Sequence, residues 1–249
     1  AWSYGLHMTE ARQVDGERVR QEILLADHIV CASGFTASAV REIRSAAPLS
    51  IVPYGCSCIP SRFSKPSTQS GIPKLLFVVQ GVQRKGLHHL LKVWSSRKDW
   101  GAELSLVCSS IDPGLRPIIH ASPLPIRVEA NLPVTELQKR FQEADIFVMP
   151  SLAEGFGLVY LEALAAGCVV VGTTTTGLPD LCADEEVVKI LDAGNLQQLE
   201  QTLVHIIKMV KAREIDPADI SAKASKANTW QAFRDGIKRV VVQFGSHDC

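Results

Sequence analysis

The sequence of 249 residues lacks an excess of charge of either sign. It contains 26 Lys and Arg residues against 26 Asp and Glu residues, so its formal net charge is +0. A nucleic-acid surface or a strongly anionic partner would require a basic excess or a basic patch. The composition therefore predicts no nucleic-acid partner, and any phosphate binding must be local.

Long uninterrupted apolar runs are also missing. The most apolar stretch, residues 158–172, contains Glu162 and Gly167 and is too short to cross a bilayer. The first residues show no signal-peptide pattern. These absences predict a cytoplasmic protein with no transmembrane segment, and the 46% hydrophobic content predicts a globular core.

The seven cysteines show no spacing of the zinc-binding type. The two that lie closest together, Cys56 and Cys58, are separated by a single residue. An odd number of cysteines at irregular spacing is typical of reduced, buried thiols. No GxGxxG motif follows a predicted strand, so a nicotinamide cofactor has little support. The sequence therefore predicts neither a metal nor a cofactor.

What the chain does contain is a regular alternation of strands and helices. Near-continuous apolar strands between helices are typical of a parallel sheet covered by helices on both faces, so the predicted fold class is α/β and Rossmann-like. The Pro-rich residues 112–125 are predicted to be an irregular surface connection. His88 and His89 fall on a predicted helix, where one of them is expected to be exposed. The predicted strands are 26–33, 49–54, 74–80, 102–108, 126–129, 146–150, 168–172 and 187–190, and the predicted helices are 10–25, 36–45, 86–97, 135–143, 158–166, 195–212 and 229–244.

A shift in composition divides the chain. Residues 55–73 are rich in Ser, Pro, Lys and Gly, which is typical of a linker. The linker separates residues 1–54, which hold one βαβ unit, from the more complete α/β alternation of residues 74–228. Residues 229–249 form a separate terminal helix.

Residues 151–180 are the most informative stretch, because they combine a loop, a helix, a buried strand and a turn. Between Gly155 and Pro179 the one charged residue is Glu162, which lies near the apolar side of the predicted helix. Burying an unpaired carboxylate costs on the order of several kcal/mol. Glu162 therefore needs a partner, which is either a ligand with hydroxyl donors or an Arg or Lys elsewhere in the chain.

Glu154 precedes the same helix, beside Gly155 and Gly157, where a ligand can approach the backbone closely. The free N–H groups of the first helical turn favour an anion at this position. Acidic residues are also common at helix N-termini, where they complement the helix dipole. The residues alone leave both interpretations of Glu154 open.

A second strand end carries two cations. Gly81 and Gly86 flank Arg84 and Lys85 just before a predicted helix, an arrangement that suits a diphosphate. The alternative is a solvated surface turn. The diphosphate interpretation gains weight because ligands of open α/β sheets bind at the carboxyl ends of the strands, where both loops would meet.

The residues around both strand ends resemble those of the family-four retaining glycosyltransferases, whose B-type fold has two Rossmann-like domains. The resemblance rests on the E-x7-E region and extends over nearly the whole chain. The E-x7-E region matches at Glu154, Gly155, Phe156, Gly157, Glu162, Ala163, Gly167, Gly177, Leu178, Pro179 and Asp180, and further matches are Gly81, Arg84, Lys85 and Gly86, Glu136 and Leu137, residues 144–151, Val52, Pro53 and Gly55, and residues 26–36.

The resemblance implies roles for eleven residues. Arg84 and Lys85 would hold the donor diphosphate and stabilise the departing nucleotide, with Gly81 beside them. Glu162 would accept hydrogen bonds from the ribose hydroxyls, and Glu154 would face the transferred sugar. The remaining donor-binding residues would be Gly155, Phe156, Gly157 and Leu158 at the sugar and phosphate, and Asn131 and Leu132 at the base.

The family's reaction transfers a sugar from a nucleotide-diphosphate donor to an acceptor hydroxyl with retention and without a metal. The donor would be of the UDP, GDP or ADP type, and the acceptor a glycan, a lipid or a small molecule. Two positions depart from the family pattern: Ala130 replaces the usual Gly and narrows the base pocket slightly, and Val159 replaces a common Pro.

By this resemblance the chain is the C-terminal, donor-binding half with the end of the N-terminal domain, and the terminal helix packs back toward that domain. We expect such a fragment to be inactive alone, since half of the catalytic cleft would be missing. Peripheral membrane contact would come through the missing half. Two alternatives remain: a nucleotide-sugar epimerase or phosphorylase of the same fold, and a non-catalytic nucleotide-sugar binding module.

Overall fold

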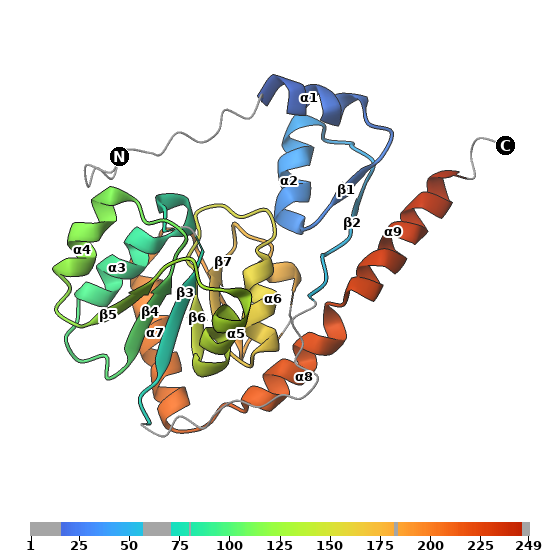
Figure 1. Cartoon of the computed structure of the whole chain (residues 1–249). Helices are drawn as coiled ribbons and strands as arrows, with labels where there is room; N and C mark the ends of the chain where they lie inside the picture. Colours follow the sequence, from blue (N-terminus) through green and yellow to red (C-terminus); the bar gives the residue numbers. More distant parts are fainter. Residues whose placement is uncertain (1–15, 57–70, 80, 182–183, 246–249) are drawn as a thin grey trace.

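The computed structural model describes residues 16–56, 71–79, 81–181 and 184–245, and its main feature is a six-stranded parallel sheet (Figure 1). The order of the strands across the sheet is β5-β4-β3-β6-β7-β8, and every neighbouring pair is parallel. The strands are β3 (Lys74–Val78), β4 (Glu103–Val107), β5 (Ile126–Glu129), β6 (Ile146–Val148), β7 (Val169–Thr173) and β8 (Val188–Leu191).

Helices cover both faces of this sheet, so its central strands are buried on both sides. All residues of β6 and β7 are buried, which explains why these strands are apolar without alternation. Helices α5 and α6 lie in front of the sheet and α7 lies behind it, next to α3 (Figure 1). The expected α/β, Rossmann-like fold is confirmed. These helices are α3 (Leu87–Ser95), α5 (Val134–Glu143), α6 (Leu158–Ala165) and α7 (Leu196–Lys211).

The strand order creates a topological switch point between β3 and β6. The chain runs from β3 outward to β4 and β5, then returns to the other side of β3 as β6 and continues outward to β7 and β8. The loops that follow β3 and β6 therefore leave in opposite directions. Ligands of open α/β folds bind at such a switch point, at the carboxyl end of the sheet.

Residues 16–54 form a smaller region, which we name the N-terminal unit. It contains α1 (Gly16–Leu25), β1 (Ile29–Cys31), α2 (Gly34–Ile43) and β2 (Leu49–Ile51), with β1 and β2 paired in parallel. Ser33 and Thr36 form a capping box that fixes the start of α2. Both strands have exposed apolar side chains: Val30 is 43% exposed and Ile51 is 42% exposed.

The last helices connect the two regions. Helix α8 (Pro217–Ala227) packs on α6, and α9 (Trp230–Gly245) extends along the N-terminal unit (Figure 1). The rings of Trp230 and Phe233 lie 6.3 and 5.5 Å from the ring of Tyr54. Within the described residues, no helix has the length and apolar composition that crossing a membrane requires.

Several local predictions were wrong. Residues 112–125 are not irregular throughout, because they contain η2 (Pro113–Leu115) and α4 (Arg116–His120). The prolines fit there since a first helical turn needs no N–H donor, and Asp112 caps the turn. His88 and His89 are both buried, whereas one was expected to be exposed. Helix α8 was not predicted at all.

Other predictions fall partly outside the described residues. Of the linker 55–73, residues 57–70 are not described, and neither is the first part of the helix predicted at 10–25. Cys31, Cys108 and Cys168 are free and buried, in agreement with the predicted thiols. The division of the chain into domains stays a prediction.

Candidate functional site

The loops after β3 and β6 are joined to each other at the switch point. After β3, Gly81 pairs with Ile111 beyond β4, and the chain then turns through η1 (Gln83–Lys85). Gly86 has a left-handed φ of 77°, and a Cβ there would overlap the carbonyl oxygen of Pro150. The backbone N–H of Leu152 donates to the carbonyl oxygen of Arg84 at 2.8 Å. The loops after β3 and β6 therefore form one continuous surface.

Three of the predicted site residues meet on the surface that these two loops form. Arg84 Nη1 donates to Glu154 Oε2 at 3.3 Å and to the carbonyl oxygen of Ala153 at 2.9 Å, and Lys85 forms an ion pair with the same carboxylate. Lys85 and Glu154 are mostly covered, with side chains 11% and 18% exposed, whereas Arg84 is 54% exposed. Because two cations share one carboxylate, a net positive charge remains. The site can accept an anion.

The charge of Lys85 is sensitive to its surroundings. Burial, with a contribution from the neighbouring Arg84 cation, lowers the pKa of Lys85 to about 8. An anionic ligand would favour the protonated form of this lysine. Its protonation and the binding of an anion are therefore coupled.

The loop that carries Glu154 is fixed by the residues that follow β7. The N–H of Glu154 donates to the carbonyl oxygen of Thr175 at 3.0 Å. Gly177 lies so close to Phe156 that a Cβ on it would stand 2.7 Å from the Phe156 carbonyl oxygen. Gly157, with φ 85°, then turns the chain into α6. The predicted residues Gly155, Phe156, Gly157 and Leu158 thus lie directly beside the Glu154 carboxylate.

The N-terminal unit closes the other side of this loop. A cavity of about 520 Å³ lies between them. Ser33 Oγ donates to the carbonyl oxygen of Gly155 at 2.5 Å, and the ring of Tyr54 meets Phe156 edge-on at 5.1 Å. Neither Ser33 nor Tyr54 was predicted to belong to the site. The lining residues are Ile29, Val30, Cys31, Ala32, Thr36, Val40, Tyr54, Glu154, Gly155, Phe156, Gly157 and Leu158.

The other predicted residues lie at the same edge of the sheet but are not all brought together. Glu162 is half-buried on α6. Asn131, with a left-handed φ of 52°, and Leu132 follow β5, two strands away from β3, and neither lines the 520 Å³ cavity. A separate hollow of about 330 Å³ reaches from Ile111, the bridge partner of Gly81, to Ala130. The predicted base-binding residues therefore lie near this second hollow.

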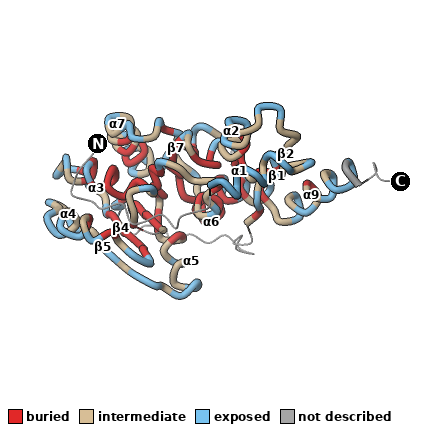
Figure 2. Tube along the Cα trace, turned by 90° about the horizontal axis from the view of Figure 1, so that it is seen from above, coloured by how far each residue is buried: buried red, intermediate tan, exposed pale blue. Residues whose placement is uncertain are grey.

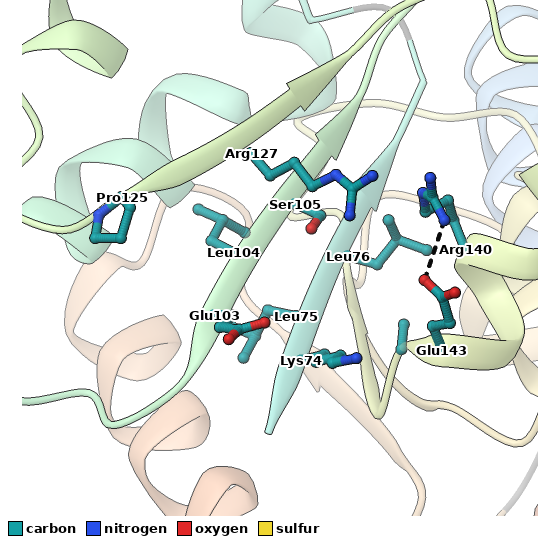
Figure 3. A pocket seen from close by; sticks show the side chains of 11 residues that line it. Lys74, Leu75, Leu76, Glu103, Leu104, Ser105, Pro125, Arg127, Arg140 and Glu143 are labelled. Carbon is teal, nitrogen blue, oxygen red and sulfur yellow. Dashed lines mark hydrogen bonds and ion pairs between the residues drawn. The ribbon is translucent and has the colours of Figure 1, made fainter. Parts of the chain in front are cut away.

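A third hollow, of about 270 Å³, lies over the sheet near the starts of β3 and β4, where Lys74 and Glu103 stand (Figure 3). Its arginines are already paired: Arg140 Nε donates to Glu129 at 2.7 Å and its Nη1 to Glu143 at 3.1 Å. Arg127 donates to Glu129 at 3.0 Å. Because these charges neutralise each other far from the switch point, we assign this hollow no part in the site.

Fold and site together define a class: an α/β protein with a Rossmann-like sheet and a cationic site at its switch point. The chain belongs to the family described as glycosyl transferases group 1, whose model matches residues 72–209, more than half of the chain. The matched segment includes all eleven predicted site residues.

The relatives found by sequence comparison are glycosyltransferases by name. A D-inositol 3-phosphate glycosyltransferase from Paenarthrobacter aurescens is 35% identical over 115 residues, which cover 43% of this chain and 28% of that protein. The sulfoquinovosyl transferase SQD2 from Arabidopsis thaliana is 30% identical over 119 residues, 46% of this chain and 23% of that protein. The alignments span less than a third of these relatives.

Solved structures confirm the fold over nearly the whole chain. Sucrose-phosphate synthase from Thermosynechococcus elongatus is similar over 98% of this chain and 65% of its own, with a TM-score of 0.78 and 18% identity. Anabaena HepE, solved in complex with UDP, is similar over 96% of this chain and 71% of its own, with a TM-score of 0.73 and 16% identity. At these identities the similarity shows the fold alone.

Proposed function

We propose that this chain is the donor-binding part of a retaining glycosyltransferase that transfers a sugar from a nucleotide-diphosphate donor to an acceptor hydroxyl. The observation that carries the proposal is the meeting of Arg84 and Lys85 with Glu154 at the switch point of the sheet. Membership of the glycosyl transferases group 1 family supports it, as does the UDP complex of the structurally similar HepE.

In the proposed mechanism the two cations stabilise the leaving group. When the glycosidic bond breaks, negative charge collects on the diphosphate oxygens. Arg84 and Lys85 would neutralise this charge, and α6, which begins four residues after Glu154, would add the positive end of its helix dipole. Fixed charges of this kind do the work that a divalent ion does in other phosphate sites, so we propose a reaction without a metal.

In this proposal Glu154 pairs first with the two cations and, once the donor is bound, with the hydroxyls of the transferred sugar. Without ligand, its carboxylate neutralises part of the charge on Arg84 and Lys85. A bound diphosphate would take over both cations and leave the carboxylate free to accept hydrogen bonds from the hydroxyls of the transferred sugar. The cations would thus stay paired before and after binding, which limits the cost of burying Lys85.

The base and ribose would lie along the same edge of the sheet. Glu162 would accept hydrogen bonds from the ribose hydroxyls, and the base would lie against Asn131 and Leu132, beside the 330 Å³ hollow that includes Ala130. The lining of this hollow is mostly apolar, which suits the flat face of a base.

Calorimetric titration with UDP, GDP and ADP tests this proposal. We expect one of the three to bind, and Glu162→Gln to weaken it by about tenfold, since a charged acceptor for two hydroxyls is lost. Glu136→Gln on α5, outside the site, is the matched control and should bind like the unmodified chain. No binding of any nucleotide, or equal binding by the Glu162 variant, would contradict the proposed site.

A further inference from the structure

The turn between β1 and α2 touches the site at two points. Ser33 Oγ donates to the carbonyl oxygen of Gly155, the residue that follows Glu154, at 2.5 Å. The N–H of the next residue, Gly34, donates to Asp180 Oδ2 at 2.8 Å. Two consecutive residues of the N-terminal unit therefore hold two segments that are 25 positions apart in the region of the six-stranded sheet and its helices, residues 74–211, which we name the sheet domain.

Those two segments are themselves joined. Asp180 ends the short turn η3 (Leu178–Asp180), which begins directly after Gly177. Gly177 packs on Phe156, and the N–H of Glu154 donates to the carbonyl oxygen of Thr175. The contacts form a closed ring that runs from the Glu154 loop to Ser33 and Gly34, on to Asp180, and back through residues 175–177 to the Glu154 loop.

The ring leaves little space for adjustment. A Cβ on Gly34 would stand 3.1 Å from Asp180 Oδ1, and a Cβ on Gly155 would stand 3.4 Å from Thr36 Cγ2. Ser33 is completely buried, and its hydroxyl is also the acceptor for the N–H of Thr36. Asp180 completes the ring from the exposed side, where its negative charge lies at the start of α2 and is favoured by the helix dipole.

We infer that Ser33, Gly34 and Asp180 act as a latch that holds the Glu154 loop in one position. Asp180 and Ser33 are positioning residues in this inference, because they act on Glu154 through Gly155 and touch no ligand themselves. Arg84 and Lys85 also pair with Glu154, but Gly86 and the bond from Leu152 to Arg84 fix their own positions, and neither contact is part of the ring. If the latch opens, recognition of the sugar by Glu154 should be lost while the nucleotide diphosphate is still bound, a consequence that rests on the proposed function.

Hydrogen exchange of the ligand-free chain tests the latch without any assumption about function. The substitution Asp180→Ala removes the acceptor for Gly34 and changes an exposed side chain, so the fold should persist. We expect backbone exchange in residues 153–158 to become at least five times faster. Asp180→Asn keeps an acceptor oxygen and should restore most of the protection.

Asp216→Ala is the matched control, since Asp216 also accepts a backbone N–H, that of Ala218, at the start of a helix. Its effect should stay within α8. Unchanged exchange in residues 153–158 of the Asp180→Ala variant, or an equal increase in the control, would overturn the latch.

The second measurement compares UDP with UDP-glucose, GDP with GDP-mannose and ADP with ADP-glucose, using whichever nucleotide binds. We expect Asp180→Ala to bind the free nucleotide like the unmodified chain and to lose the affinity that the sugar adds, three- to tenfold. Equal loss for both ligands would contradict positioning of Glu154. If no nucleotide binds, the proposed function fails, and the exchange experiment still decides whether the latch exists.

Discussion

The sheet domain and the N-terminal unit differ in how they bury their strands. Every residue of β6 and β7 is buried between helices, whereas Cys31 is the one buried residue among the described strands β1 and β2. Figure 2 shows the same contrast, with buried segments concentrated around β7 and β4 and exposed segments along α1, β2 and α9. The sheet domain therefore contains its own core, and the N-terminal unit depends on contacts made outside its own sheet.

The candidate site lies on the boundary between these two regions. Its cations are held by the sheet domain, through Gly86 and the bond from Leu152 to Arg84. Its carboxylate, Glu154, lies in a loop that the N-terminal unit holds through Ser33 and Tyr54. Although the cations pair with Glu154, we expect that anion binding and the positioning of Glu154 can be disturbed separately.

The largest effect should come from the core of the sheet domain. Phe147 is completely buried in β6 and contacts the rings of Phe141 and Tyr160. We expect Phe147→Ala to lower the free energy of unfolding by about 3–5 kcal/mol, because it leaves a cavity. Val30→Ala in β1, which removes a half-exposed side chain, should cost less than about 1 kcal/mol. Urea unfolding monitored by circular dichroism measures both, and similar losses would contradict the contrast between the regions.

The next effect concerns the cations. Replacing both Arg84 and Lys85 by Ala should weaken nucleotide diphosphate binding by about 100-fold or more, because two charge-assisted contacts of about 1.5–3 kcal/mol each are lost. Calorimetry of the best-binding nucleotide measures the change. Lys226→Ala, an exposed cation on α8, is the control and should leave the affinity unaltered. A loss below about fivefold in the double variant would mean that the diphosphate binds elsewhere.

The buried histidine pair should make the sheet domain sensitive to acid. Burial lowers the pKa of His88 to about 4, and the ring of His89 lies beside it, tilted by 43°, with the ring centroids 3.9 Å apart. The unfolded chain takes up this proton near pH 6.5 and the folded chain near pH 4, so stability is lost as the pH falls between these values. We expect a loss of about 1–2 kcal/mol between pH 7 and pH 5.

Urea unfolding at the two pH values measures this loss, and His88→Leu should remove most of it. A variant with the same pH dependence as the unmodified chain would show that other groups cause the acid sensitivity.

The smallest effect should be the pH dependence of ligand binding. Lys85 has a pKa of about 8 in the free protein and must be protonated to bind a diphosphate. Above pH 8 binding therefore takes up a proton, and affinity should fall by about fivefold between pH 8 and pH 9. Titrations across this range measure the slope. Lys85→Arg keeps its charge at these pH values and should bind with a nearly flat profile.

Most elements of the fold could be predicted from the sequence because their apolar periodicity is strong. The strand 126–129 was predicted with the observed bounds, and α6 within one residue of its end. Helix α4 was missed because Pro113 and Pro117 indicated a loop, although both fit the first turns of helical segments. The burial of both His88 and His89 could not be predicted, because residues far away in the sequence cover this turn of α3. Gly194, for example, lies close to the ring of His89.

The type of fold and the identity of the charged residues at its switch point follow directly from the sequence. Apolar strands alternate with helices, and Arg84, Lys85 and Glu154 follow two of those strands in positions that a parallel sheet must bring to one edge. Tertiary structure alone decided that the N-terminal unit would hold the Glu154 loop. The bonds from Ser33 to Gly155 and from Gly34 to Asp180 join residues 122 and 146 positions apart. Their geometry depends on how two regions pack, and no local pattern of residues encodes that packing.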